Sequence, residues 1–245
     1  MIITIDGINI NYCRLGSGKQ TILFLHGWHQ NYGFEKYQKL LTCLSKKFTV
    51  IALDLPGFGQ TDLNPVPWTV FAYADFVSKF ITHLKLKSFI LAGHSFGGRL
   101  SLILSTNSSI SPLISHLILI DSAGLEIKNL KTKLILYLSR VTPKPIKKLF
   151  SPLFSSSDYS NLSGIKKQSF SLVVSQDLSH LLPDIKIPTL LLWGGLDHLT
   201  PLAHAHIFHK NIKNSKLVTS PKDNHGLPYR NHSFVCRQIQ KFINR

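Results

Sequence analysis

A serine between two glycines is the feature of this chain that most directly indicates chemistry. Gly93, Ser95 and Gly97 stand in the run Gly-His-Ser-Phe-Gly, which matches the pattern G-x-S-x-G. A serine hydroxyl becomes a nucleophile when a neighbouring base takes its proton, and the chain offers 12 histidines as candidates for that base. The pattern therefore indicates attack on a carbonyl carbon through a covalent intermediate.

The segments on either side of Ser95 favour this interpretation. The apolar residues 88–93 predict a buried strand, and residues 96–106 predict a helix. A strand that turns at once into a helix forces the serine into a strained conformation, and glycines on both sides remove side chains that would collide. We expect this turn to lift the hydroxyl above the sheet, close to the first amides of the helix.

With this elbow, the sequence resembles the α/β-hydrolase superfamily over essentially its whole length. The resemblance implies a serine, an acid and a histidine in that order along the chain. It places the base at His225, after the last predicted strand, and the acid at Asp197, after the preceding one. Asp121 is a second candidate for the acid, because some members of the family carry it after that earlier strand. The family often has glycine before its histidine, where this chain has Asn224.

The resemblance also implies two backbone amides that would complete the machinery. The run Leu-His-Gly-Trp follows the predicted strand 21–26, where the family forms half of its oxyanion hole. The N–H groups of Trp28 and Phe96 would then bind the negative charge that develops on the substrate oxygen. One such donor typically contributes about 3 kcal/mol to the stabilisation of the transition state. No step of this scheme requires a metal or an organic cofactor, and we expect none.

The other histidines have simpler interpretations. We expect His94 to pack beside the nucleophile and His198 to point away from Asp197. A predicted surface helix carries three more, without the paired spacing and the carboxylate that a zinc site would need. These three are His204, His206 and His209.

The elements that must position these residues can also be predicted. Short apolar runs alternate with segments of helical periodicity, which predicts an α/β fold: a mostly parallel eight-stranded sheet with helices on both faces. The first two strands form a hairpin around Asp6-Gly7, and Thr69 is the expected N-cap of a helix. The other predicted strands are 21–26, 49–55, 88–93, 116–122, 189–194 and 215–220, and the helices are 33–47, 69–84, 96–106, 202–211 and one from about 231.

Residues 124–187 break the alternation, because they hold no convincing strand and are long for one connection. We interpret them as a helical cap inserted into a core domain of residues 1–123 and 188–245. The apolar residues of the cap either face a hydrophobic substrate group or attach the cap to the core; they are Leu134, Leu138, Leu149, Phe150 and Phe154. Its lysines either face solvent or attract an anionic substrate or a lipid surface; they are Lys144, Lys147 and Lys148.

Composition limits the partners and the compartment. Lys and Arg number 28 against 12 acidic residues, for a net charge of +16. The lysines are spread along the chain without a nucleic-acid-binding motif, so we expect no nucleic-acid partner and at most weak association with a membrane surface. The apolar runs are too short to span a bilayer, and no signal peptide is evident, which predicts a cytoplasmic protein. Cys13, Cys43 and Cys236 are interpreted as free thiols in a reducing compartment.

The function that these features predict is a carboxylesterase with a Ser-His-Asp triad and an acyl-enzyme. Its substrate would be a small molecule, an ester of small to medium, hydrophobic acyl groups, and its activity would fall in acid as the histidine takes a proton. Two alternatives stay open: a carbon–carbon bond hydrolase or lyase with the same triad, and a non-catalytic ligand receptor on the same scaffold. No feature of the sequence specifies an oligomeric state.

Overall fold

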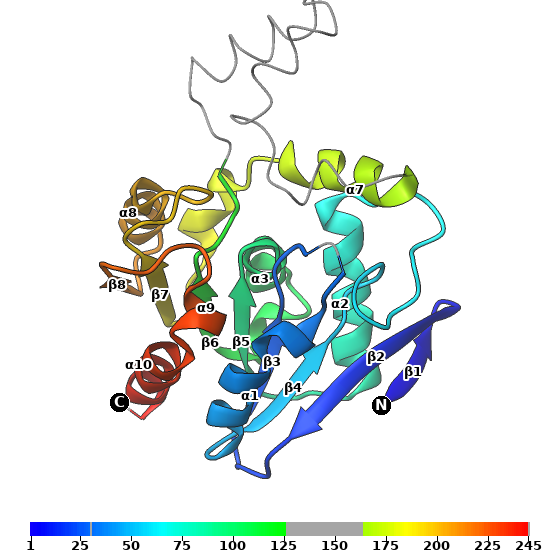
Figure 1. The fold of residues 1–245 in the computed structure, drawn as a ribbon, viewed down its shortest axis with the longest axis horizontal. Helices are drawn as coiled ribbons and strands as arrows, with labels where there is room; N and C mark the ends of the chain where they lie inside the picture. Colours follow the sequence, from blue (N-terminus) through cyan, green and yellow to red (C-terminus); the bar gives the residue numbers. More distant parts are fainter. Residues whose placement is uncertain (30, 126–163, 245) are drawn as a thin grey trace, which may run out of the picture.

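The computed structural model describes residues 1–29, 31–125 and 164–244 of the chain. Eight strands form one sheet in the order β1-β2-β4-β3-β5-β6-β7-β8. The β1–β2 and β2–β4 pairs are antiparallel and all other neighbours are parallel, which confirms the predicted fold class. The strands are β1 Ile2–Ile5, β2 Ile8–Leu15, β3 Thr21–Leu25, β4 Thr49–Leu53, β5 Phe89–His94, β6 Ile114–Ile120, β7 Thr189–Gly194 and β8 Ser215–Ser220 (Figure 1).

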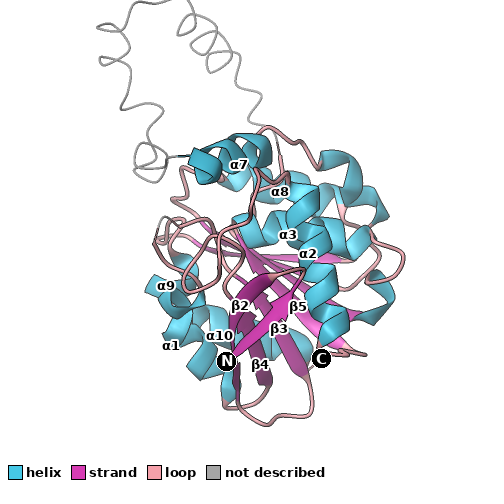
Figure 2. Cartoon of the chain, turned by 90° about the vertical axis from the view of Figure 1, so that its right-hand side faces the viewer, coloured by secondary structure: helices cyan, strands magenta, loops and turns pink. Residues whose placement is uncertain are grey.

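Helices cover both faces of this sheet (Figure 2). Helices α1 and α10 pack against each other on one face, whereas α2, α3 and α8 contribute to a second apolar core on the other. None of the helices among the described residues is long and apolar enough to cross a membrane. The helices are α1 Gln38–Ser45, α2 Val70–His83, α3 Phe96–Thr106, α7 Gly164–Val174, α8 Leu202–Asn211, α9 Leu227–Arg230 and α10 His232–Ile243, with 3₁₀ turns η1 Phe34–Tyr37, η2 Ser111–Leu113 and η4 Ser179–Asp184.

The local sequence explains where several elements begin. The Thr69 hydroxyl accepts a hydrogen bond from the Ala72 N–H at 3.2 Å, which confirms the predicted N-cap of α2. Asp6 and Gly7 both have positive φ, as a two-residue turn between β1 and β2 requires. Strand β5 is buried at every position because it lies in the middle of the sheet, with helices on both sides.

The predicted cap at 124–187 lies only in part among the described residues. Helix α7 lies across the carboxyl ends of the parallel strands, at the top of Figure 1. It is attached there by Ser169, whose Oγ accepts the Trp68 N–H at 3.0 Å. The apolar and lysine residues named above for the cap lie outside the described residues, and the boundaries of the cap stay a prediction.

The cysteine prediction is wrong for two of the three residues. Cys43 on α1 and Cys236 on α10 form a disulfide with their Cα atoms 6.3 Å apart, and Cys13 is a free cysteine. The two partners are separated by 193 residues of sequence. Their proximity arises from the packing of α1 against α10, which spacing along the chain does not reveal.

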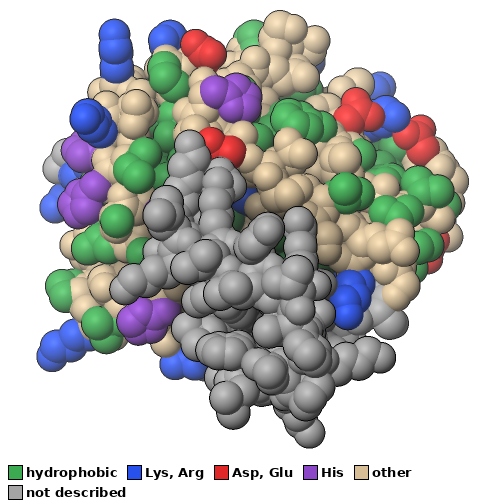
Figure 3. Space-filling model, turned by 90° about the horizontal axis from the view of Figure 1, so that it is seen from above, with side chains coloured by type: hydrophobic (Ala, Val, Ile, Leu, Met, Phe, Trp, Pro, Cys, Tyr) green, Lys and Arg blue, Asp and Glu red, His purple; other side chains and the backbone are tan. Residues whose placement is uncertain are grey.

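The positive charge is distributed over the surface. Seen from above the carboxyl ends of the strands, lysine and arginine side chains lie around the outline of the molecule and do not gather in one patch (Figure 3). Hydrophobic side chains and histidines lie among them. Charged and hydrophobic side chains are thus interspersed over the described part of this face, in keeping with the even spread of lysines along the sequence.

Candidate active site

Ser95 occupies a strained turn at the carboxyl end of β5. Its φ of 50° and ψ of −107° lie where residues other than glycine are rare, at a cost of roughly 1–3 kcal/mol. Backbone hydrogen bonds hold this conformation. The Ser95 N–H donates to the Ile120 carbonyl at 3.1 Å, and the Ser95 carbonyl accepts the N–H groups of Arg99 and Ala123.

The glycines of the motif allow α3 to approach the sheet this closely. A Cβ at Gly93 would collide with the Gly97 carbonyl and the Ser101 hydroxyl. A Cβ at Gly97 would collide with the carbonyl of Leu25 in the neighbouring strand. The glycines of G-x-S-x-G are therefore required because no side chain fits at these two positions where the strand meets the helix.

Three side chains from different loops meet at this elbow. His225 Nε2 lies 2.9 Å from Ser95 Oγ, and His225 Nδ1 lies 2.8 Å from Asp197 Oδ2. Asp197 comes from the loop between β7 and α8, and His225 from the loop between β8 and α9. Both loops leave the carboxyl ends of parallel strands, which is why residues so distant in sequence come together.

The environment of Asp197 favours a charged carboxylate. Burial on its own would raise the pKa of Asp197, but hydrogen bonds from His225 and Thr200 outweigh this effect and hold the pKa below its usual range. The Thr200 hydroxyl donates to Oδ2 at 2.6 Å, and the N–H groups of Leu199 and Thr200 donate to Oδ1. Asp197 can therefore orient the His225 ring and stabilise it once it is protonated.

Asp121, the other candidate for the acid, has a different environment. One of its oxygens accepts the Gly194 N–H at 2.8 Å, whereas its Oδ2 is buried without a hydrogen-bond partner. Burial, with a smaller effect from the negative charge of Asp197, raises the pKa of Asp121 to about 8. The His225 ring is hydrogen-bonded to Asp197, so the structure pairs the histidine with the acid that the family resemblance placed first.

Asp121 also belongs to a cluster whose size would suit a metal ion. One donor atom each from His94, Asp121 and His225 lie within 4.8 Å of one another. However, every ring nitrogen of the two histidines already has a hydrogen-bond partner in the protein: Ser95 and Asp197 for His225, and Tyr37 and the His225 carbonyl for His94. A metal would have to displace these partners, so the donor set fits a hydrogen-bonded cluster and not a metal site.

Trp28 and Phe96 lie side by side next to the serine. Phe96 is the first residue of α3, so its N–H has no carbonyl within the helix to bind, and the ring centroids of Trp28 and Phe96 are 5.1 Å apart. The Trp28 ring also contacts Phe58 on the loop after β4 and Phe170 on α7, with centroids 4.8 and 5.1 Å away. These rings form an aromatic cluster, here called the aromatic wall, next to the turn that carries Ser95.

The remaining predicted residues lie away from these contacts. His198 is exposed, although Asp197 next to it is buried. His206 and His209 are exposed on α8, and His204 is half-buried there. By contrast, sequence reasoning missed the hydrogen-bonding role of His94, which is fully buried; its position in the motif gave no signal of one.

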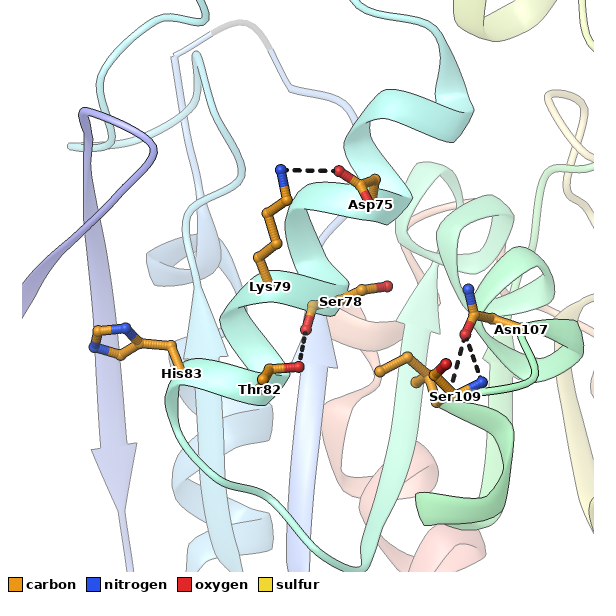
Figure 4. Close-up of a pocket in the computed structure, with 8 residues that line it drawn as sticks. Asp75, Ser78, Lys79, Thr82, His83, Asn107 and Ser109 are labelled. Carbon is orange, nitrogen blue, oxygen red and sulfur yellow. Dashed lines mark hydrogen bonds and ion pairs between the residues drawn. The ribbon is translucent and has the colours of Figure 1, made fainter.

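A surface groove of about 480 Å³ lies at the opposite end of the sheet (Figure 4). It runs between α2 and the turn after α3, close to where β6 begins, whereas Ser95 follows the carboxyl end of β5. Its polar groups bind one another: Lys79 pairs with Asp75 and with Asp6, and the Asn107 side chain accepts backbone N–H groups. The groove therefore lies far from the elbow and brings no set of chemically reactive side chains to Ser95.

Comparison with known proteins agrees with the fold. A family model described as "alpha/beta hydrolase fold" matches residues 20–134, and a second, described as "TAP-like protein", matches residues 168–245. The chain belongs to the α/β-hydrolase superfamily.

Several curated relatives span nearly the whole chain. Serine hydrolase BPHL of Homo sapiens is 29% identical over 243 residues, covering 93% of this chain and 80% of its own. A pimeloyl-[acyl-carrier protein] methyl ester esterase of Legionella pneumophila (strain Corby) is 28% identical over 254 residues, covering 96% of this chain and 100% of its own. An esterase structure from Exiguobacterium antarcticum superimposes with a TM-score of 0.76 at 24% identity, covering 100% and 98% of the two chains, and supports the fold.

Proposed function

We propose that this hydrolase cleaves carboxylic esters, with Ser95 as nucleophile, His225 as general base and Asp197 as the acid that orients the base. One observation carries the proposal: hydrogen-bond contacts of 2.9 and 2.8 Å link the three side chains in series at a strained strand-to-helix turn. Esterases among the relatives that span the chain add support.

Acylation follows from this arrangement. His225 Nε2 takes the proton of Ser95 as Oγ attacks the ester carbonyl carbon, and the negative charge moves to the carbonyl oxygen. The backbone N–H groups of Trp28 and Phe96 bind that oxygen. The carbon–oxygen bond then breaks, and the leaving alcohol departs with the proton from His225. Asp197 keeps its charge throughout and stabilises the protonated ring.

Deacylation repeats these steps with water. His225 takes a proton from a water molecule, whose oxygen attacks the acyl carbon bound to Ser95. The bond to Oγ breaks, Ser95 regains its proton from His225, and a carboxylic acid is released. His225 carries out every proton transfer in the cycle, so no cofactor takes part in the scheme.

The surroundings of the serine favour an apolar acyl group of small to medium size. Aromatic rings from three parts of the chain form the wall: Trp28 after β3, Phe58 after β4 and Phe170 on α7. Lys166 Nζ lies 4.4 Å from the centroid of the Phe58 ring, so the wall carries a cation at its edge. An acyl group with an apolar chain and a polar end would match the aromatic rings and the cation of Lys166.

The test is a series of p-nitrophenyl esters of increasing acyl length, with Ser95→Ala as the control. We expect rapid hydrolysis of the shorter and medium esters, and loss of that activity in Ser95→Ala. Slow ester turnover together with rapid labelling by a fluorophosphonate would favour carbon–carbon bond hydrolysis by the same triad. Absence of both turnover and labelling would contradict the proposal and favour a ligand receptor.

A further inference from the structure

A chain of hydrogen-bonded side chains, which begins at the half-buried Lys36 and continues through buried residues, runs behind the elbow to the loop that carries His225. Lys36 Nζ lies 3.1 Å from His29 Nδ1, and His29 Nε2 lies 2.8 Å from the Tyr37 hydroxyl. The hydroxyl lies 2.7 Å from His94 Nδ1, and His94 Nε2 lies 2.9 Å from the His225 carbonyl oxygen. The path thus connects the 3₁₀ turn η1 with the backbone of His225.

Chemistry fixes the direction of each hydrogen bond in this chain. A carbonyl oxygen only accepts, so His94 Nε2 carries the proton and donates it to His225, and His94 Nδ1 accepts from Tyr37. At the other end an ammonium group only donates, so His29 Nδ1 accepts from Lys36 and His29 Nε2 donates to Tyr37. The Gly27 N–H also donates to the Tyr37 oxygen, at 3.0 Å. Every polar atom of the path then has a complementary partner.

This pattern requires both imidazoles to be neutral, and their surroundings ensure it. Burial lowers the pKa of His94 well below its usual range, and the charge of His225 acts in the same direction. Burial and the neighbouring Lys36 lower the pKa of His29 to about 2. Neither ring takes a proton at a pH where a serine hydrolase works, so the network keeps one arrangement while His225 changes charge.

The hydrogen bond from His94 holds the backbone of His225 itself, within the loop between β8 and α9. Among the described residues, His94 is the hydrogen-bond partner of the His225 carbonyl. The peptide and the imidazole of His225 share one Cα, so a fixed carbonyl also fixes where the ring begins. Gly27 leaves room for the Tyr37 hydroxyl on the other side of the His94 ring, because a Cβ there would approach His94 Nδ1 to 2.7 Å and the Tyr37 oxygen to 3.1 Å.

We propose that His94, held by the Tyr37 hydroxyl, is a positioning residue that keeps the His225 imidazole in line with Ser95 and Asp197. This inference rests on the proposed function. Misplacement of a reacting group by about 1 Å costs up to a hundredfold in rate, so the effect is expected in kcat more than in KM. The hydrogen bond of His94 goes to the His225 carbonyl and not to the reacting atoms, and the two imidazole rings lie 5.0 Å apart between centroids.

Two substitutions of His94 separate its two hydrogen bonds. A glutamine amide nitrogen reaches the place of Nε2 and still donates to His225, whereas an asparagine amide reaches only the place of Nδ1. We expect His94→Gln to keep most of kcat, and His94→Asn to lower kcat between about tenfold and a hundredfold with KM changed less than about threefold. His116→Asn, on β6 away from the elbow, is the matched control and is expected to leave both constants unchanged.

Nuclear magnetic resonance gives a readout that does not depend on turnover. The proton between His225 Nδ1 and Asp197 should give a far-downfield signal in the wild-type protein. We expect this signal to be broadened or shifted in His94→Asn and restored in His94→Gln.

A second variant tests the hydroxyl that holds His94. Tyr37→Phe removes this hydroxyl and should lower kcat several-fold and broaden the same signal. If His94→Asn does not fold, Tyr37→Phe tests whether His94 positions His225. An unchanged signal and kcat in a folded His94→Asn, or in Tyr37→Phe, would overturn the inference. If the wild-type protein neither turns over esters nor reacts with a fluorophosphonate, the proposed function fails, while the signal still tests the positioning.

Discussion

Two buried aspartates follow neighbouring strands of the sheet, and their surroundings give them opposite properties. Asp197, after β7, receives hydrogen bonds on both oxygens and keeps a low pKa. Asp121, after β6, has one oxygen without a partner and a pKa raised to about 8. Burial raises the pKa of both carboxyls, and the interactions of His225 and Thr200 with Asp197 outweigh burial at Asp197 alone. The loop after β7 is built to hold an anion, and the end of β6 is not.

The most severe test of this contrast replaces the charged carboxylate. Asp197→Asn removes the charge that orients and stabilises His225, and we expect kcat to fall by roughly 10⁴-fold. Asp121→Asn should change kcat by less than about threefold, because its carboxyl is already neutral near pH 7. Steady-state kinetics of both variants on one p-nitrophenyl ester make the comparison. Similar losses in the two variants would mean that the aspartates share one role.

A smaller effect is expected from the group that holds Asp197 in place. Thr200→Val removes the hydroxyl that donates to Oδ2, a hydrogen bond to a charged acceptor that contributes on the order of 1.5 kcal/mol. We therefore expect kcat/KM to fall about tenfold. Thr200→Ser keeps the hydroxyl and is the matched control. Full activity in Thr200→Val would show that the backbone N–H groups alone hold the carboxylate.

The contrast also predicts a dependence of stability on pH. Unfolding moves the pKa of Asp121 from about 8 to its ordinary value of 3.8, so the folded state binds this proton more tightly. The contribution of Asp121 to stability is complete below pH 4 and is lost as the pH rises to about 8. Relative to Asp121→Asn, the wild-type protein should lose thermal stability between pH 5 and pH 8. Parallel melting-temperature profiles for the two proteins would contradict the raised pKa.

Much of the scaffold could be predicted because its signals are local. Helix α3 has the bounds that the elbow motif predicted, and the β1–β2 turn lies at Asp6 and Gly7 as expected. Strand β6 begins at Ile114, two residues before the predicted start, and the short helix α9 was not predicted. Strand ends and single-turn helices depend on packing more than on periodicity.

The parts of the site that escaped prediction depend on contacts between distant segments. The elbow motif predicted Ser95, the order implied by the family predicted Asp197 and His225, and the three side chains lie within hydrogen-bond distance in series. Nothing in the sequence linked Tyr37 to His94, or Cys43 to Cys236, because these contacts form only when η1, α1 and α10 pack beside the sheet. Likewise, the pKa values of Asp121 and Asp197 differ because of the groups that surround each carboxylate in the folded protein, such as His225 and Thr200 at Asp197.

The central claim is that Ser95 is a nucleophile activated by the pair of His225 and Asp197. Peptide mapping by mass spectrometry after reaction with a fluorophosphonate tests it most directly. The account predicts one adduct, on the peptide that carries Ser95, formed far more slowly in His225→Ala and absent in Ser95→Ala. An adduct on another residue, or a rate unchanged in His225→Ala, would contradict it.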